Sequence, residues 1–98
     1  MSLTIRPEAQ EDISEAFDWY EDRTPGLGSE FLRSVRACLA QIERTPELFP
    51  ESFEDTRRAS VRRFPYGVFF TADKHVSIIH AVYHVRRDPR GWHERTGA

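Results

Sequence analysis

The feature that most constrains this chain is an apolar run near its C-terminus. Residues 76–85 read VSIIHAVYHV, and two arginines, an aspartate and a proline follow directly. The run is too short to cross a membrane as a helix, and it is too rich in β-branched and aromatic side chains for a surface strand. We therefore expect the central strand of a sheet, covered on both faces, with a basic segment at its C-terminal end.

Two amphipathic helices are expected before that strand. Pro7 suits the first turn of the first helix, and Gly28 or Ser29 can cap a second helix that runs to about Arg44. The connector, residues 24–28, is short and has two glycines free to take φ > 0, which predicts an antiparallel helix hairpin on one sheet. The apolar face of each helix follows the i, i+3, i+4, i+7 spacing. These faces are Ala9, Ile13, Ala16, Phe17 and Tyr20, then Phe31, Val35, Cys38, Leu39 and Ile42.

The remaining segments alternate between strand and turn signals. A short first strand is expected over residues 2–6 and a loop over residues 46–55. Three strands should follow, over residues 57–64, 66–72 and 75–85, with Asp73 and Lys74 at the tip of the last hairpin. The expected order is β-α-α-β-β-β, an α+β fold in which the helix hairpin packs on a mainly antiparallel sheet. With 98 residues, we expect a single domain over residues 1–98.

Charge is divided unevenly along the chain. Residues 1–55 contain 13 acidic and 5 basic side chains, whereas residues 56–98 contain 9 basic and 3 acidic ones. Arginine supplies nearly all of the basic charge, and its planar guanidinium suits carboxylates and phosphates. This division indicates a basic surface for an acidic partner. The alternative is that the arginines pair with the acids of the first half and imply no partner.

Signals for other classes of protein are weak. The N-terminus lacks a secretory signal and no segment approaches a transmembrane span, so we expect a cytoplasmic protein with no membrane partner. The single Cys38 offers neither an intramolecular disulfide nor a zinc pair. His80 and His84, four apart on a strand, should share a face about 13 Å apart, too far for shared metal ligation. We expect no metal and no cofactor.

Catalytic motifs are equally scarce. There is no nucleophile elbow, glycine-rich phosphate loop or HExxH sequence. His84 is the one histidine to consider as an acid or base, although donation to a backbone carbonyl is the favoured interpretation. The early acids of the first helix, interpreted as an outward, solvated face, are Glu8, Glu11, Asp12 and Glu15.

The arginines of the second half are the strongest functional signal. If the strands pair as expected, many guanidinium groups converge on one side of the sheet, where they can bind phosphates or an acidic protein face. Trp92 is either packed on the helices or an anchor at an interface. The candidate binding residues are Arg58, Arg62, Arg63, Arg86, Arg87, Arg90 and Trp92, with Arg57 and Arg95 nearby in the sequence.

Several phrases resemble one known family. Residues 61–70 (VRRFPYGVFF) and 81–89 (AVYHVRRDP), with Trp92, are similar to the RelE/ParE toxin superfamily of type II toxin–antitoxin systems. Residues 16–20 (AFDWY) and the Phe31-Leu32 pair resemble its ParE-type, plasmid-stabilisation branch. The resemblance covers about residues 3–95 and implies the same β-α-α-β-β-β order.

The two branches of that family imply different mechanisms. RelE-type toxins cleave mRNA in the ribosomal A site, where cations stabilise the transition state after attack by a ribose 2′-hydroxyl. Laid on that pattern, Arg58 and Arg86 match basic positions. The departures are Gly67 at an expected arginine, Ser60 at an expected lysine and Trp92 near an expected tyrosine.

ParE-type toxins inhibit DNA gyrase without a demonstrated catalytic step, and an antitoxin with an acidic wrapping segment neutralises them. The resemblance therefore favours a ParE-like gyrase inhibitor with a cognate antitoxin, more a binding protein than an enzyme. One alternative is a RelE-like mRNA endonuclease acting on the ribosome, which would use Arg58, Arg63, Arg86 and His84. The other is an inactive member that only binds an antitoxin.

Overall fold

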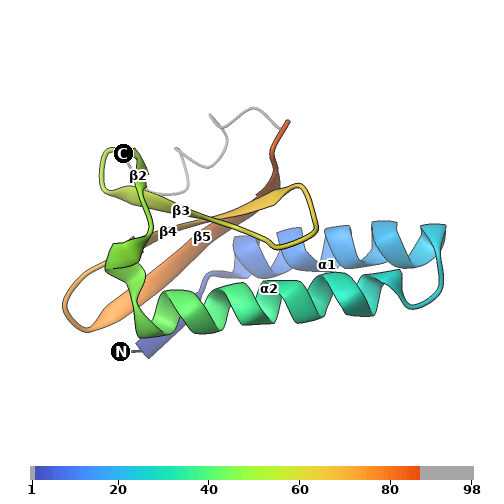
Figure 1. The fold of residues 1–98 in the computed structure, drawn as a ribbon, viewed down its shortest axis with the longest axis horizontal. Helices are drawn as coiled ribbons and strands as arrows, with labels where there is room; N and C mark the ends of the chain where they lie inside the picture. The colour runs from blue at the N-terminus through green and yellow to red at the C-terminus, as the bar shows by residue number, and fades with distance from the viewer. Residues whose placement is uncertain (1, 87–98) are drawn as a thin grey trace.

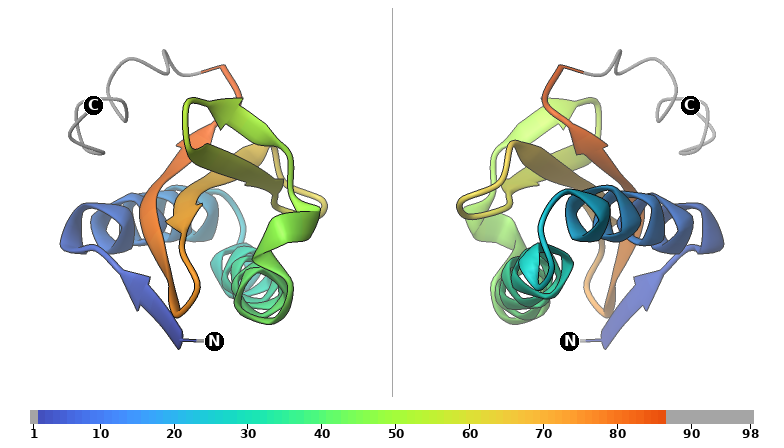
Figure 2. Two further views of the ribbon diagram at one scale, coloured as in Figure 1. Left: turned by 90° about the vertical axis from the view of Figure 1, so that its left-hand side faces the viewer. Right: turned by 90° about the vertical axis from the view of Figure 1, so that its right-hand side faces the viewer.

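The computed structural model describes residues 2–86, which form a helix hairpin lying on one face of a twisted sheet (Figures 1 and 2). Three of the candidate residues, Arg87, Arg90 and Trp92, lie outside the described residues. The elements are β1 (Ser2–Ile5), α1 (Pro7–Arg23), α2 (Leu27–Arg44), the 3-10 turn η1 (Pro46–Leu48), β2 (Glu51–Phe53), β3 (Thr56–Ser60), β4 (Tyr66–Ala72) and β5 (Val76–His84).

The sheet has five strands in the order β1-β5-β4-β3-β2. Strand β1 runs parallel to β5 at one edge, and the other neighbours are antiparallel. The α+β class and the two-helix, mainly antiparallel arrangement are thus confirmed. The prediction that residues 76–85 form the central strand was wrong in one respect, because β4 is central and β5 lies between β4 and the short β1.

Local turn chemistry accounts for the other differences in the sheet. The segment expected as a loop contains η1 and the short edge strand β2. Strand β3 ends at Ser60 because the following loop, residues 61–65, places Arg63 at φ 74° before Pro65. The β4–β5 turn has three residues instead of two, and the Asp73 carboxylate accepts the N–H groups of His75 at 2.8 Å and Val76 at 2.9 Å.

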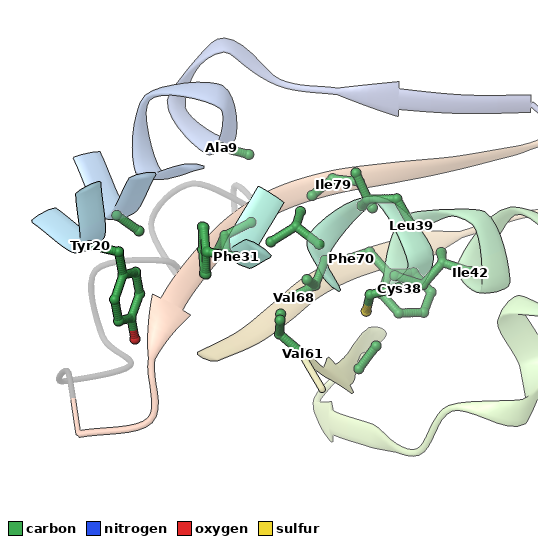
Figure 3. Close-up of a cluster of buried hydrophobic side chains, with 14 residues drawn as sticks. Ala9, Tyr20, Phe31, Cys38, Leu39, Ile42, Val61, Val68, Phe70 and Ile79 are labelled. Carbon is green, nitrogen blue, oxygen red and sulfur yellow. The ribbon is translucent and has the colours of Figure 1, made fainter. Parts of the chain in front are cut away.

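The core lies between the hairpin and the sheet, with Tyr20 towards one end of the cluster and Ile42 towards the other (Figure 3). All five predicted α2 side chains are buried, which confirms that face. On α1, the prediction was right for Ala9, Ala16 and Tyr20 and wrong for Asp12, whose side chain is buried rather than outward. Phe31 packs within 5.3 Å of Tyr20 between ring centroids, so the aromatic side chains tie both helices together.

The connector between the helices depends on the Glu21 carboxylate. It accepts the N–H of Gly26 at 2.9 Å and that of Gly28 at 3.0 Å, two amides at the start of α2 that have no helical partner. Of these two glycines, Gly26 takes a positive φ and Gly28 does not, so the prediction for Gly28 was wrong. Gly28 belongs to α2, where a Cβ atom would lie 2.8 Å from the Phe17 carbonyl oxygen, so the absence of a side chain lets the two helices approach this closely.

A bulge in β5 changes which face its side chains take. Phe69 pairs with Ala81 and Phe70 pairs with Ile79, which leaves His80 as an extra residue. The His80 ring contacts Thr71 on the face away from the helices. The prediction that His80 and His84 share a face was therefore wrong, because His84 lies beside Tyr66 on the helix-covered face.

Candidate functional site

Three of the predicted arginines are brought together at one end of the sheet. The Val85 N–H donates to the Pro65 carbonyl at 2.8 Å, which holds the β3–β4 loop beside the end of β5. Arg62 and Arg63 belong to this loop, Arg86 follows β5, and all three are exposed. We call Arg62, Arg63 and Arg86 the basic end. The basic end forms because the start of β4 pairs with the end of β5, about 20 residues further along the sequence.

Arg58 lies on a different surface from the basic end. It is opposite Phe69 in the β3–β4 ladder and projects from the sheet face away from the helices. A Cβ atom on Gly67 would lie 2.9 Å from its Nε atom. The Arg58 side chain therefore passes over the position where the RelE-type pattern expects a second arginine.

Intramolecular ion pairs do not account for these four arginines. Among residues 2–86, the ion pairs within 4 Å are Arg6 with Glu8 at 3.5 Å and Arg57 with Glu51 at 3.7 Å. Arg57 also donates to the Phe49 carbonyl, so the idea that arginines pair within the chain holds for Arg57. Within the described chain, it does not hold for Arg58 or the basic end.

The backbone of Arg63 is strained. Its φ of 74° lies in the left-handed region. For a residue with a side chain this region costs about 1–2 kcal/mol, and such strain concentrates at functional sites. A glycine would take the same φ without that cost, so the loop geometry alone does not call for arginine here.

His84 accepts rather than donates a backbone hydrogen bond. Its Nδ1 atom accepts the Arg86 N–H at 3.1 Å, which corrects the prediction of donation to a carbonyl. With Nδ1 as acceptor, the neutral ring carries its proton on Nε2. The ring is half-buried, packs 5.4 Å from the Tyr66 ring between centroids, and fixes the chain as it turns towards Arg86.

A cleft that the sequence did not predict opens between α1 and the ends of β4 and β5. Its volume is about 540 Å³. The lining residues are Asp12, Glu15, Ala16, Trp19 and Tyr20 from α1, Pro65 and Tyr66 around the start of β4, and Val82 and His84 from β5. The sequence contains one signal for this cleft. Trp19 lies off the apolar face of α1, and a large aromatic side chain there indicates a contact outside the core. The Trp19 side chain remains 51% exposed.

Asp12 forms one wall of this cleft. Its carboxylate accepts the Val82 N–H at 3.0 Å, in a buried hydrogen bond that spans 70 residues of sequence. In the described chain β1 accompanies β5 only as far as Ile79, so Asp12 caps the next outward amide of the strand. The carboxylate thereby fastens α1 to β5 and blocks the strand edge beside the cleft.

His80 and Cys38 are also buried. Burial lowers the pKa of His80, and Arg6 lowers it further while Glu8 acts in the opposite direction. Burial raises the pKa of the Cys38 thiol to about 11, so this cysteine is a poor nucleophile. Across residues 2–86, no group of three or more His, Cys, Asp or Glu side chains is placed to hold a metal ion. No helix of the described chain has the length and apolarity to span a membrane.

Comparison with known proteins places this geometry in context. A family model described as "ParE toxin of type II toxin-antitoxin system, parDE" matches residues 3–89. No curated protein matches the sequence. Among solved structures, "Chromosomal ParDE TA system from P. aeruginosa" is similar, with a TM-score of 0.65 at 18% identity. That match covers 86% of this chain and 95% of the other, and it shows a shared fold.

Proposed function

Since the chain belongs to the ParE toxin family of type II toxin–antitoxin systems, we propose that it inhibits DNA gyrase and that a cognate antitoxin neutralises it. The observation that carries the proposal is the basic end. The three exposed arginines of the basic end lie in the β3–β4 loop (Arg62 and Arg63) and just after β5 (Arg86). They form no ion pair within the described chain.

The chemistry of the basic end fits both proposed partners. Gyrase holds DNA, whose phosphates accept charge-assisted hydrogen bonds from guanidinium groups, and an acidic antitoxin segment offers carboxylates of the same kind. Arg63 takes a left-handed φ that glycine would adopt without strain, and such strain is typical of functional sites. Neutralisation then follows if antitoxin and gyrase compete for the same arginines.

The endonuclease alternative is less well supported by the same surface. Such a reaction requires several cations around one phosphate. Arg58 passes over Gly67, so a second cation at position 67 would have to displace it. The Nδ1 atom of His84 is engaged by the Arg86 N–H. These contacts favour a binding protein.

The proposal is tested by growth of cells that express variants of the chain. Replacing Arg62 and Arg86 with Gln and Arg63 with Gly removes three charges, and glycine tolerates the φ at position 63. Growth arrest should be lost while thermal stability is kept.

The matched control replaces three exposed arginines of α2 with Gln, namely Arg33, Arg36 and Arg44. This variant should arrest growth as the wild type does. Growth arrest by the variant without its basic end, at equal expression, would contradict the proposal.

A further inference from the structure

We propose that the cleft between α1 and β5 takes a basic side chain, flanked by apolar ones, from the antitoxin. This inference rests on the proposed function. It gives the antitoxin a second contact, whose charge is opposite to that of its contact with the basic end. The basic end would meet the acidic part of the partner, and the cleft would meet a lysine or arginine.

The size and lining of the cleft fit protein side chains. A volume of about 540 Å³ is within the usual range of about 300–1,000 Å³ for binding pockets. Apolar surface comes from Ala16, Pro65 and Val82, and aromatic surface comes from Trp19 and Tyr66. Such a lining binds an apolar segment and leaves the polar groups to fix its identity.

The charge of the cleft selects a cation. Glu15 is exposed on the cleft wall and, within residues 2–86, forms no ion pair or hydrogen bond. Glu11 and Asp18 lie four and three residues away on α1, so they are its neighbours on the helix surface and are also exposed. A cation placed at Glu15 would relieve this repulsion among like charges, whereas an acidic side chain would increase it.

Trp19 adds apolar surface at the mouth of the cleft. The guanidinium carbon of Arg23 lies over one face of the Trp19 ring, 3.9 Å from its centroid. Half of the Trp19 side chain remains exposed at the mouth of the cleft. An incoming lysine or arginine can therefore lay its aliphatic stem against the indole while its charge reaches Glu15.

The cleft favours a partner that inserts side chains over one that adds a strand. Along the outer edge of β5, the Val82 N–H is already taken by the buried Asp12 carboxylate. An added strand would have to displace this hydrogen bond at Val82, which disfavours strand addition at this part of the edge. A helix that lays one face into the cleft meets no such obstacle.

The cleft and the basic end are adjacent along the sequence at the end of β5. His84 lines the cleft, and Arg86 lies two residues further on. A partner that fills both must therefore carry a basic and an acidic group in a fixed order. This order provides specificity that an acidic segment alone lacks, because a partner with only acids would be repelled at Glu15.

The test measures the affinity of the full-length chain for its purified cognate antitoxin. Glu15→Gln should weaken binding roughly tenfold, and the loss should shrink as salt is raised. Trp19→Leu should also weaken binding. The control Glu43→Gln, at an exposed position on α2, should bind as the wild type does. Melting temperatures should stay equal, which separates binding from folding.

Charge exchange gives the decisive arm of the test. Glu15→Lys should abolish most binding, and replacing one basic residue of the antitoxin with Glu should restore it. Wild-type affinity in both Glu15→Gln and Glu15→Lys would overturn the inference and leave the proposed function intact. Failure of the wild type to bind the antitoxin would overturn both. If the cleft variants change self-association without antitoxin, the occupant is a second copy and the inference is also wrong.

Discussion

Removal of the Asp12 carboxylate should unfasten α1 from the sheet and destabilise the whole domain. Asp12 is 7% exposed, and its carboxylate accepts the Val82 N–H at 3.0 Å. In Asp12→Ala this buried amide loses its acceptor. A hydrogen bond to a charged group contributes about 1.5–3 kcal/mol. Alanine offsets some of that loss because it is a better helix former than aspartate by about 0.6 kcal/mol.

The net loss should therefore be about 2 kcal/mol in the free energy of unfolding, which corresponds to about 8–16 °C in Tm for a domain of this size. Urea and thermal unfolding, followed by circular dichroism, measure it. Asp12→Asn keeps a carbonyl acceptor without charge, so it should lose about half as much. Glu11→Ala, at an exposed neighbour in the same helix, serves as the control and should change stability little.

A loss below about 0.5 kcal/mol in Asp12→Ala would refute the reasoning, since this is the range of ordinary surface substitutions. Equal losses in Asp12→Ala and Glu11→Ala would lead to the same conclusion. In either case the attachment of α1 to β5 would depend on apolar packing, and strand addition beside the cleft would no longer be disfavoured.

Three further predictions concern the interior. Gly28→Ala should lower Tm in thermal unfolding, although alanine favours helices, because its Cβ atom would lie 2.8 Å from the Phe17 carbonyl oxygen; an increase in Tm would contradict this packing. Cys38, with a pKa of about 11, should react with iodoacetamide at pH 8 roughly 100-fold more slowly in the folded chain than in urea; equal rates would show the thiol to be accessible. Because the pKa of His80 is lowered in the folded chain, His80 takes up a proton at a higher pH in the unfolded chain, near 6.5, than in the folded one. Unfolding free energy should therefore drop from pH 7 to pH 5, and His80→Gln, which can still contact Thr71, should reduce that drop; an unchanged slope would contradict it.

Periodicity predicted the helices well because it reports a local property. Phe31, Val35 and Ile42 repeat at helical spacing, and each is fully buried against the sheet. The same reasoning misplaced Asp12, because its partner, the Val82 amide, is 70 residues away in the sequence. A carboxylate at the start of a helix is usually solvated. The sequence around Asp12 does not distinguish it from a carboxylate that accepts a hydrogen bond from a strand.

The limits of the sheet prediction have a similar cause. The apolar run over residues 76–85 indicated a strand inside the sheet, and β5 does have a neighbour on each side, although β4 is the central strand. The run could not show the bulge that sends His80 to the far face. The bulge depends on register with β4, which the sequence of β5 does not contain. The sequence predicted that arginines of the second half would converge, and three of them form the basic end. The cleft was not, because its walls come from α1, β4 and β5 together.

Inhibition of gyrase is the central claim, and a supercoiling assay with purified chain and gyrase from the source organism tests it most directly. The account predicts that supercoiling stops and linear plasmid accumulates with the wild type and with the α2 control. Neither should occur in the variant that lacks the basic end. Normal supercoiling by gyrase, together with mRNA cut at codon boundaries in a translating extract, would contradict the account and assign the chain to the endonuclease branch.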